Sequence, residues 1–142
     1  PYCTRSHPGW PLRGIMSPAQ PSSCPRMEGL PDEALAQVAA YFQALSEPTR
    51  LQILNLLRER EHSVGELAQR CGFSAANISR HLTLLTQHGL VQRTSRGNSA
   101  IYSIADPSVY ALCDLVCGSI ARKFDRLAAE RAAFLPAGVP RG

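Results

Sequence analysis

The stretch SVGELAQRCGFSAANISRHLTLLTQHGLVQRTSRGNSAIY, residues 63–102, decides the fold. Ser63 with Glu66 three residues later predicts a capping box at the start of a helix. Cys71-Gly72-Phe73-Ser74 predicts a tight turn, because glycine takes the left-handed position and serine caps the next helix. That next helix places three apolar residues on one face: Ile78, Leu82 and Leu85.

Two short β segments follow this helix pair. Residues 90–94 and 100–104 are predicted strands, and Ser95-Arg96-Gly97-Asn98-Ser99 is predicted to join them as a hairpin. Helix, glycine turn, helix and hairpin is the order of a winged helix-turn-helix. In such a fold the second helix enters the major groove of DNA.

Helices are predicted on both sides of this stretch. Pro31-Asp32-Glu33 predicts the start of a first helix, and Ser46 is the predicted cap of a second helix that begins near Pro48. A long last helix is predicted over 108–134. Its apolar stripe comprises Tyr110, Leu112, Leu115, Val116, Ile120, Phe124 and Leu127. The predicted fold is mainly α with a small β-hairpin, in the order α-α-α-α-β-β-α.

Composition divides the chain into three parts. Residues 1–27 are rich in proline and predicted to be a disordered N-terminal extension, with Met16 and Met27 as candidate natural start residues. Residues 28–134 are predicted to fold, and 135–142 to form a flexible tail. The N-terminus lacks the apolar core of a signal peptide, and no apolar run approaches the roughly 20 residues that span a bilayer. We therefore expect a cytoplasmic protein with reduced thiols and no membrane contact.

Charge is distributed unevenly. The net charge of +4 comes from arginines in the terminal segments, because residues 28–135 hold all eleven acids and an equal number of basic residues. No acid lies between Glu66 and Asp106, whereas this interval contains Arg70, Arg80, Arg93 and Arg96. The distribution indicates a positive face on the helix-turn-helix and hairpin.

The candidate DNA contacts lie on the second helix of the motif and on the hairpin. On the helix they are Ser74, Ala75, Ala76, Asn77, Ser79 and Arg80. Asparagine can pair with adenine and arginine with guanine, while small residues allow close approach. His81 is interpreted as a groove or packing residue, and Arg93 and Arg96 as phosphate or minor-groove contacts. The alternative is an ordinary amphipathic helix with a solvated polar face. His62 and His88 are interpreted as solvated polar residues.

Three segments together resemble the ArsR family of winged-helix repressors: LSEPTRLQILNLL at 45–57, the helix pair, and the hairpin RTSRGNSAIYSI at 93–104. The resemblance covers roughly residues 30–125. It implies a homodimer formed by the first and last helices, with two recognition helices on a palindromic operator. It also implies a repressor that releases DNA when a metal, metalloid or redox signal reaches its ligands.

The resemblance also shows which sensor sites are missing. The positions that match the arsenic-sensing Cys-Val-Cys are Ser63-Val64-Gly65. Those that match a zinc site are Asp106, Ser108, Ser119 and Arg122, and those that match a cadmium and lead site are Leu84 and His88. None of these sets retains its ligands, apart from Asp106.

Cys113 and Cys117 are the candidate inducer ligands. Their i, i+4 spacing puts both sulfurs on one helix face, about 6 Å apart at Cβ. Such a pair suits soft ions, with As(III) or Sb(III) favoured and no permanent cofactor expected. A third sulfur could come from Cys71, a tail cysteine, the partner subunit or a small thiol. A thiol-redox or persulfide sensor that uses the same pair is the alternative, and simple packing of buried cysteines is another.

The sequence gives little support to an enzyme. It contains no phosphate-binding glycine loop, HExxH or nucleophile elbow. A thiol enzyme built on Cys113 would lack a nearby base. A dimerisation or adaptor domain that retains the winged-helix shape is the remaining alternative.

Overall fold

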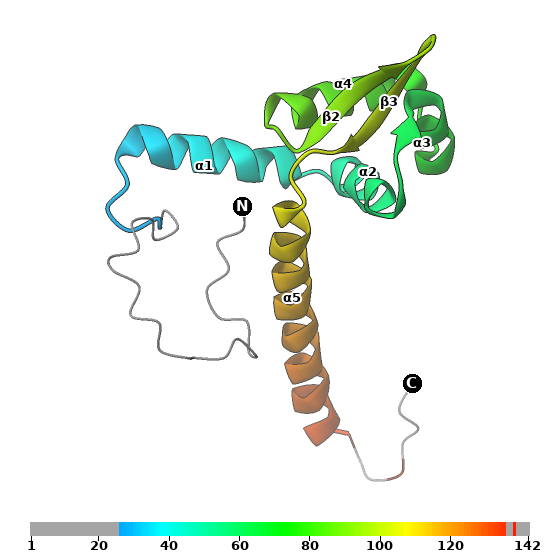
Figure 1. The fold of residues 1–142 in the computed structure, drawn as a ribbon. Coiled ribbons are helices and arrows are strands. Elements are labelled where there is room, and N and C mark those ends of the chain that lie inside the picture. The colour runs from blue at the N-terminus through cyan, green and yellow to red at the C-terminus, as the bar shows by residue number, and fades with distance from the viewer. Residues whose placement is uncertain (1–25, 136–137, 139–142) are drawn as a thin grey trace, which may run out of the picture. The chain divides into compact units, whose positions relative to one another are not determined.

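The computed structural model describes residues 26–135 and 138. The chain divides into two compact units, with the boundary between Ala105 and Asp106. The predicted disordered extension and flexible tail lie, apart from their innermost residues, outside the described residues. The elements are α1 (Asp32–Leu45), α2 (Pro48–Glu59), β1 (His62–Ser63), α3 (Val64–Cys71), α4 (Ala75–Gln87), β2 (Val91–Arg96), β3 (Ser99–Ile104) and α5 (Ser108–Ala133) (Figure 1). The predicted order is confirmed, with the short strand β1 added.

The sheet is antiparallel with strand order β1-β3-β2. Arg96 pairs with Ser99, which leaves Gly97 and Asn98 as the turn of the hairpin. Gly97 has φ 59, a left-handed conformation that glycine adopts without steric cost. The strands therefore run farther than the sequence predicts, and a two-residue turn replaces the predicted five-residue tip.

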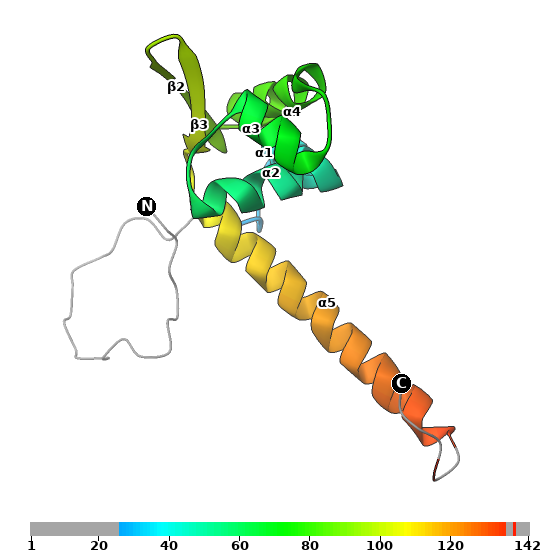
Figure 2. The same ribbon diagram turned by 90° about the vertical axis from the view of Figure 1, so that its right-hand side faces the viewer.

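The core of the first unit lies among α2, α3, α4 and the base of the hairpin. β2 contacts α4, and β3 contacts α2 and α3 (Figure 2). The predicted inner face of α4, with Ile78, Leu82 and Leu85, is confirmed. The side chains that are 0 % exposed in these elements are Ile53, Leu67, Ile78, Leu82, Leu85 and Leu90. Close packing of these residues fixes α3 and α4 against each other as a helix-turn-helix.

Local hydrogen bonds set the helix ends. The predicted capping box is confirmed, because Glu66 N donates to Ser63 Oγ at 3.2 Å and Ser63 N donates to Glu66 Oε2 at 2.8 Å. Gly72, with φ 73, ends α3, and Ser74 Oγ accepts from Asn77 N at the start of α4. These two residues produce the tight turn that the sequence predicts.

The predicted cap of α2 is wrong. Glu47 caps this helix, because its side chain accepts a hydrogen bond from Arg50 N at 2.9 Å. Ser46 instead closes α1, where its hydroxyl donates to the carbonyl of Gln43 at 2.8 Å. Glu47 directly precedes Pro48 and is therefore the residue placed to reach the free N–H groups of the first turn.

The prediction for His62 is also wrong. His62 is fully buried, whereas the sequence predicts a solvated side chain. It lies on β1, opposite Tyr102 of β3. A two-residue strand is too short to leave a periodic pattern, so its burial is visible only in the tertiary structure.

The second unit is built on α5. Asp106 supports the first turn of this helix, accepting from Ser108 N at 3.0 Å and from Ser108 Oγ at 2.6 Å. Most of the predicted apolar stripe is exposed: Leu115 to 72 % and Phe124 to 65 %. No helix within the described residues is long and apolar enough to cross a membrane.

Candidate nucleic-acid interface and cysteine pair

The N-terminal half of α4 presents the predicted DNA contacts outward. Ser74, Ala75, Ala76, Ser79 and Arg80 are all exposed. The opposite face of the same helix is buried, so its orientation in the fold is fixed. Small residues with one arginine form a surface that can approach base edges closely.

Asn77 differs from its neighbours on α4. It is half-buried, and its Oδ1 is shielded without a hydrogen-bond partner among the described residues. A bidentate contact with adenine needs both amide atoms accessible. The predicted contact therefore requires the Asn77 side chain to change rotamer on binding.

His81 faces the start of α2. Its Nδ1 lies 3.7 Å from Glu47 Oε2, and its side chain is 18 % exposed. Burial raises the pKa of Glu47, but hydrogen bonds from Arg50 and Thr49 and the charge of His81 outweigh it, so the pKa is lowered. An ionised Glu47 thus caps α2 and attracts a protonated His81. This geometry favours the packing interpretation of His81 over the groove interpretation.

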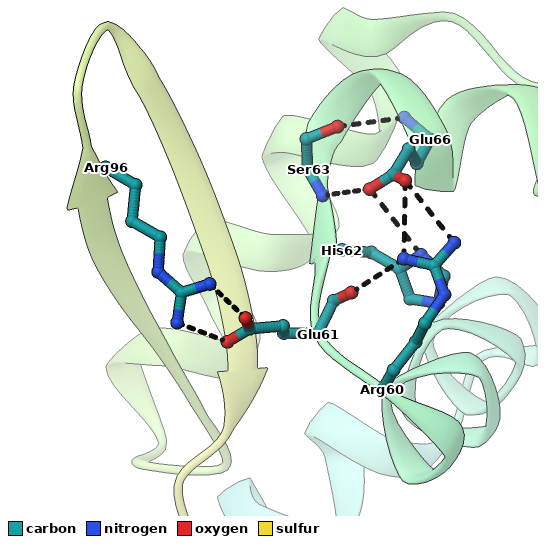
Figure 3. Close-up of polar contacts among 6 residues, drawn as sticks. All are labelled: Arg60, Glu61, His62, Ser63, Glu66 and Arg96. Atoms are coloured by element: carbon teal, nitrogen blue, oxygen red, sulfur yellow. Dashed lines mark hydrogen bonds and ion pairs between the residues drawn. The ribbon is translucent and has the colours of Figure 1, made fainter.

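The two arginines of the hairpin have different surroundings. Arg93 is exposed and has no ion-pair partner among residues 26–135. Arg96 is also exposed, but both of its terminal nitrogens contact the carboxylate of Glu61, with Nη2 3.0 Å from Oε2 (Figure 3). Glu61 immediately precedes β1, so the contact joins the hairpin to the loop after α2.

A second charged group adjoins this pair. Glu66 lies 3.3 Å from Arg60 and 3.7 Å from the buried ring of His62 (Figure 3). The backbone N–H of Ser63 is the main cause of the lowered pKa of Glu66, with a further contribution from Arg60. Sequence patterns do not predict this group, because it depends on the pairing of β1 with β3.

The two candidate inducer ligands lie on α5. Cys113 is half-buried, Cys117 is exposed, and neither forms a disulfide. With Ile120, Phe124 and Leu127 they follow alternating spacings of four and three residues, the periodicity of a coiled-coil seam. A soft ion bound to the two sulfurs would therefore lie on the apolar seam of this helix.

The candidate third ligand belongs to the other unit. Cys71 is half-buried at the end of α3, and burial raises the pKa of its thiol, so the protonated form is favoured. In the described part of the chain, no cluster of three or more Cys, His, Asp or Glu side chains could hold a metal ion. Among the described residues, the pair on α5 thus has two sulfurs and no third ligand beside it.

Comparison with known proteins shows which protein family the chain resembles. Residues 47–93 match the family model described as bacterial regulatory protein, arsR family. The HTH-type transcriptional regulator Rv0081 of Mycobacterium tuberculosis is 39% identical over 99 residues, covering 68% of this chain and 82% of the relative. A probable mercury resistance operon repressor of Streptomyces lividans is 37% identical over 97 residues, covering 68% of this chain and 71% of the relative.

Solved structures agree with the fold. The crystal structure of Rv0081 superposes with a TM-score of 0.63 at 36% identity, over 68% of this chain and 99% of that one. The solution structure of the homodimeric winged helix-turn-helix DNA-binding domain of Mb0332 from Mycobacterium bovis has a TM-score of 0.61 at 33% identity, over 70% of this chain and 95% of that one.

The fold is a winged helix-turn-helix, with α3 and α4 as the helix pair and β2 and β3 as the wing. The chain belongs to the ArsR family of bacterial regulatory proteins. It is therefore a DNA-binding transcriptional regulator and not an enzyme.

Proposed function

We propose that the chain is a homodimeric repressor that releases a palindromic operator when a soft ion binds Cys113 and Cys117, with arsenite or antimonite favoured. The observation that carries the proposal is that both cysteines lie on the exposed apolar seam of α5. The seam can pair with a second copy, and the same seam carries the ligands. No permanent cofactor is required.

The exposed surface of α4 and the wing supports the DNA-binding part of the proposal. Ser74, Ala75, Ala76, Ser79 and Arg80 approach base edges in the major groove, and Asn77 joins them after a rotamer change. Arg93, which is exposed and has no ion-pair partner among the described residues, contacts phosphate. A DNA-binding role supports a cytoplasmic location, where a bacterial operator is found.

Exposed apolar surface supports the dimer. Val116, Ile120, Phe124 and Leu127 are 48 % or more exposed in one copy. A row of large apolar side chains open to water indicates a missing partner surface. Mb0332, which shares the fold, is a homodimer, and two copies would present two α4 helices to one palindrome.

Sulfur chemistry supports the inducer. Thiolates prefer soft ions, and trivalent arsenic and antimony bind up to three of them. The third sulfur would come from the partner copy, a tail cysteine, Cys71 or a small thiol. A probable mercury resistance operon repressor is among the relatives, and mercury is another thiophilic metal. Ion binding on the seam would favour a dimer geometry in which the two recognition helices no longer fit the operator.

A thiol-redox or persulfide response is the second candidate. The exposed Cys117 thiol is accessible to oxidants. An intramolecular disulfide within one helix is unfavourable, because the two Cβ atoms do not point toward each other. Oxidation would therefore join cysteines of two copies. A persulfide donor would act differently: the thiolate attacks the donor's outer sulfur, the donor leaves as a thiol, and a persulfide remains on the cysteine.

The test is a DNA-release titration followed by fluorescence anisotropy. The duplex is a palindrome selected by the protein from a random-sequence library. Arsenite, antimonite, cadmium, lead, zinc and a persulfide donor are titrated against the wild type and against Cys113→Ser/Cys117→Ser. Cys71→Ser is titrated separately to show whether Cys71 supplies the third sulfur. We expect arsenite or antimonite to release DNA from the wild type and not from the double variant. Equal release from the double variant would exclude the site on α5, and release by persulfide alone would favour the second candidate.

A further inference from the structure

Glu61 and Arg96 form a two-point ion pair between the loop before β1 and the tip of the wing (Figure 3). Arg96 is the last residue of β2, next to the Gly97-Asn98 turn. A carboxylate that accepts from both terminal nitrogens of one guanidinium has the strongest geometry available to such a pair. The pair fixes the direction of the Arg96 side chain in the free protein.

The pair also removes the charge of Arg96 from the DNA-binding face. The ion pair of Arg96 and Glu61 has a net charge of zero as a whole, so an Arg96 held by Glu61 releases fewer counterions when it approaches a phosphate. If Arg96 left Glu61 for a phosphate, the unpaired carboxylate would remain within one side-chain length of the DNA. Repulsion at that distance is only partly screened, since the Debye length is about 8 Å at physiological salt.

We propose that Glu61 is an intramolecular counter-charge that holds Arg96 away from DNA phosphate and thereby lowers the affinity of the wing for DNA. Arg93, which has no such partner, carries the phosphate contact of the wing. This inference rests on the proposed DNA-binding role of the wing and assigns opposite roles to its two arginines.

A double-mutant cycle tests the proposal. Glu61→Gln, Arg96→Gln and the double variant are compared with the wild type for binding to a short random-sequence duplex over a range of salt concentrations. Glu59→Gln is the matched control, because Glu59 is an exposed acid two residues away and its loss changes the net charge equally. Far-UV circular dichroism of each variant reports whether the fold is retained.

The expected pattern has three parts. Glu61→Gln frees Arg96 for a phosphate, so binding becomes at least about threefold tighter, and the slope of log K against log salt steepens by about 0.9. Arg96→Gln leaves an uncompensated carboxylate beside the DNA and weakens binding by a similar factor. The double variant returns to the wild-type affinity, because a neutral pair has been replaced by two neutral side chains. Glu59→Gln leaves the slope unchanged.

Two other results would overturn the proposal. If the double variant bound as weakly as Arg96→Gln, Arg96 would contact DNA in the wild type despite Glu61. If Glu61→Gln weakened binding, the pair would serve to position the wing. Failure of the proposed function would look different from both results. The wild type itself would then show no salt-dependent DNA binding, before any variant is compared.

Discussion

The helix pair α3 and α4 buries its large apolar side chains, whereas most of α5 leaves them exposed. In α3 and α4, Leu67, Ile78, Leu82 and Leu85 are 0 % exposed, so this unit encloses its core within one copy. In α5, Leu115 and Phe124 remain 72 % and 65 % exposed. The difference indicates that the helix-turn-helix is structurally complete in a single chain, whereas α5 requires a second surface. A sensor on α5 could therefore act on the assembly without unfolding the DNA-reading unit.

The largest effect is expected for the truncation of a side chain in the enclosed core. Leu82→Ala should lower the free energy of unfolding by about 2–5 kcal/mol, because it leaves a cavity among buried side chains. Urea unfolding followed by circular dichroism measures the change. Leu115→Ala is the matched leucine truncation on α5. It should lower the free energy of unfolding far less, when both variants are measured at a protein concentration below the dissociation constant of the dimer. Equal costs at that concentration would contradict the comparison of the two units.

The next effect concerns assembly. Phe124→Ala should weaken the homodimer about tenfold or more, because a large aromatic side chain on the seam is lost. Sedimentation equilibrium gives the dissociation constant. Lys123→Ala is the control, since it truncates a neighbouring exposed residue outside the seam. A dimer equally stable in both variants would place the interface elsewhere.

A smaller effect is expected at the start of the recognition helix. Ser74→Ala should lower the free energy of unfolding by about 1 kcal/mol, because the hydroxyl that accepts from Asn77 N is removed. Ser79→Ala, an exposed serine inside the same helix, should change stability by a few tenths at most. Urea midpoints of the two variants make the comparison, and equal midpoints would show that the cap contributes nothing.

The smallest effect is in the acid response of α5. Hydrogen bonds from Ser108 lower the pKa of Asp106 below its ordinary value of 3.8. The ionised carboxylate therefore adds stability above pH 3.8, and this is lost as the pH falls through the lower folded-state value. In Asp106→Asn, the helical circular dichroism signal should fall less on acidification than in the wild type. Asp125→Asn removes an exposed carboxylate of the same helix, and its signal should fall as in the wild type. An unchanged acid response in Asp106→Asn would show that the cap does not support α5.

The local features of the DNA-reading unit were predictable from its residues. The Ser63–Glu66 capping box, the left-handed Gly72 and the Ser74 cap each depend on side chains within three or four positions, so the sequence contains the whole interaction. The inner faces of α3 and α4 follow from helical periodicity in the same way. The DNA contacts and the cysteine ligands remain predictions, because they concern molecules that meet the surface.

Contacts between distant segments were not predictable in this way. Glu61 lies 35 residues from Arg96, and only the pairing of β1 with β3 brings the loop before β1 near the wing. The burial of His62 has the same origin. The i, i+4 placement of Cys113 and Cys117 on one face of α5 was determined by the sequence alone, because helix geometry fixes it. The exposure of that face, and the ion pair between Arg96 and Glu61, were decided by the tertiary structure, since both depend on where distant segments lie.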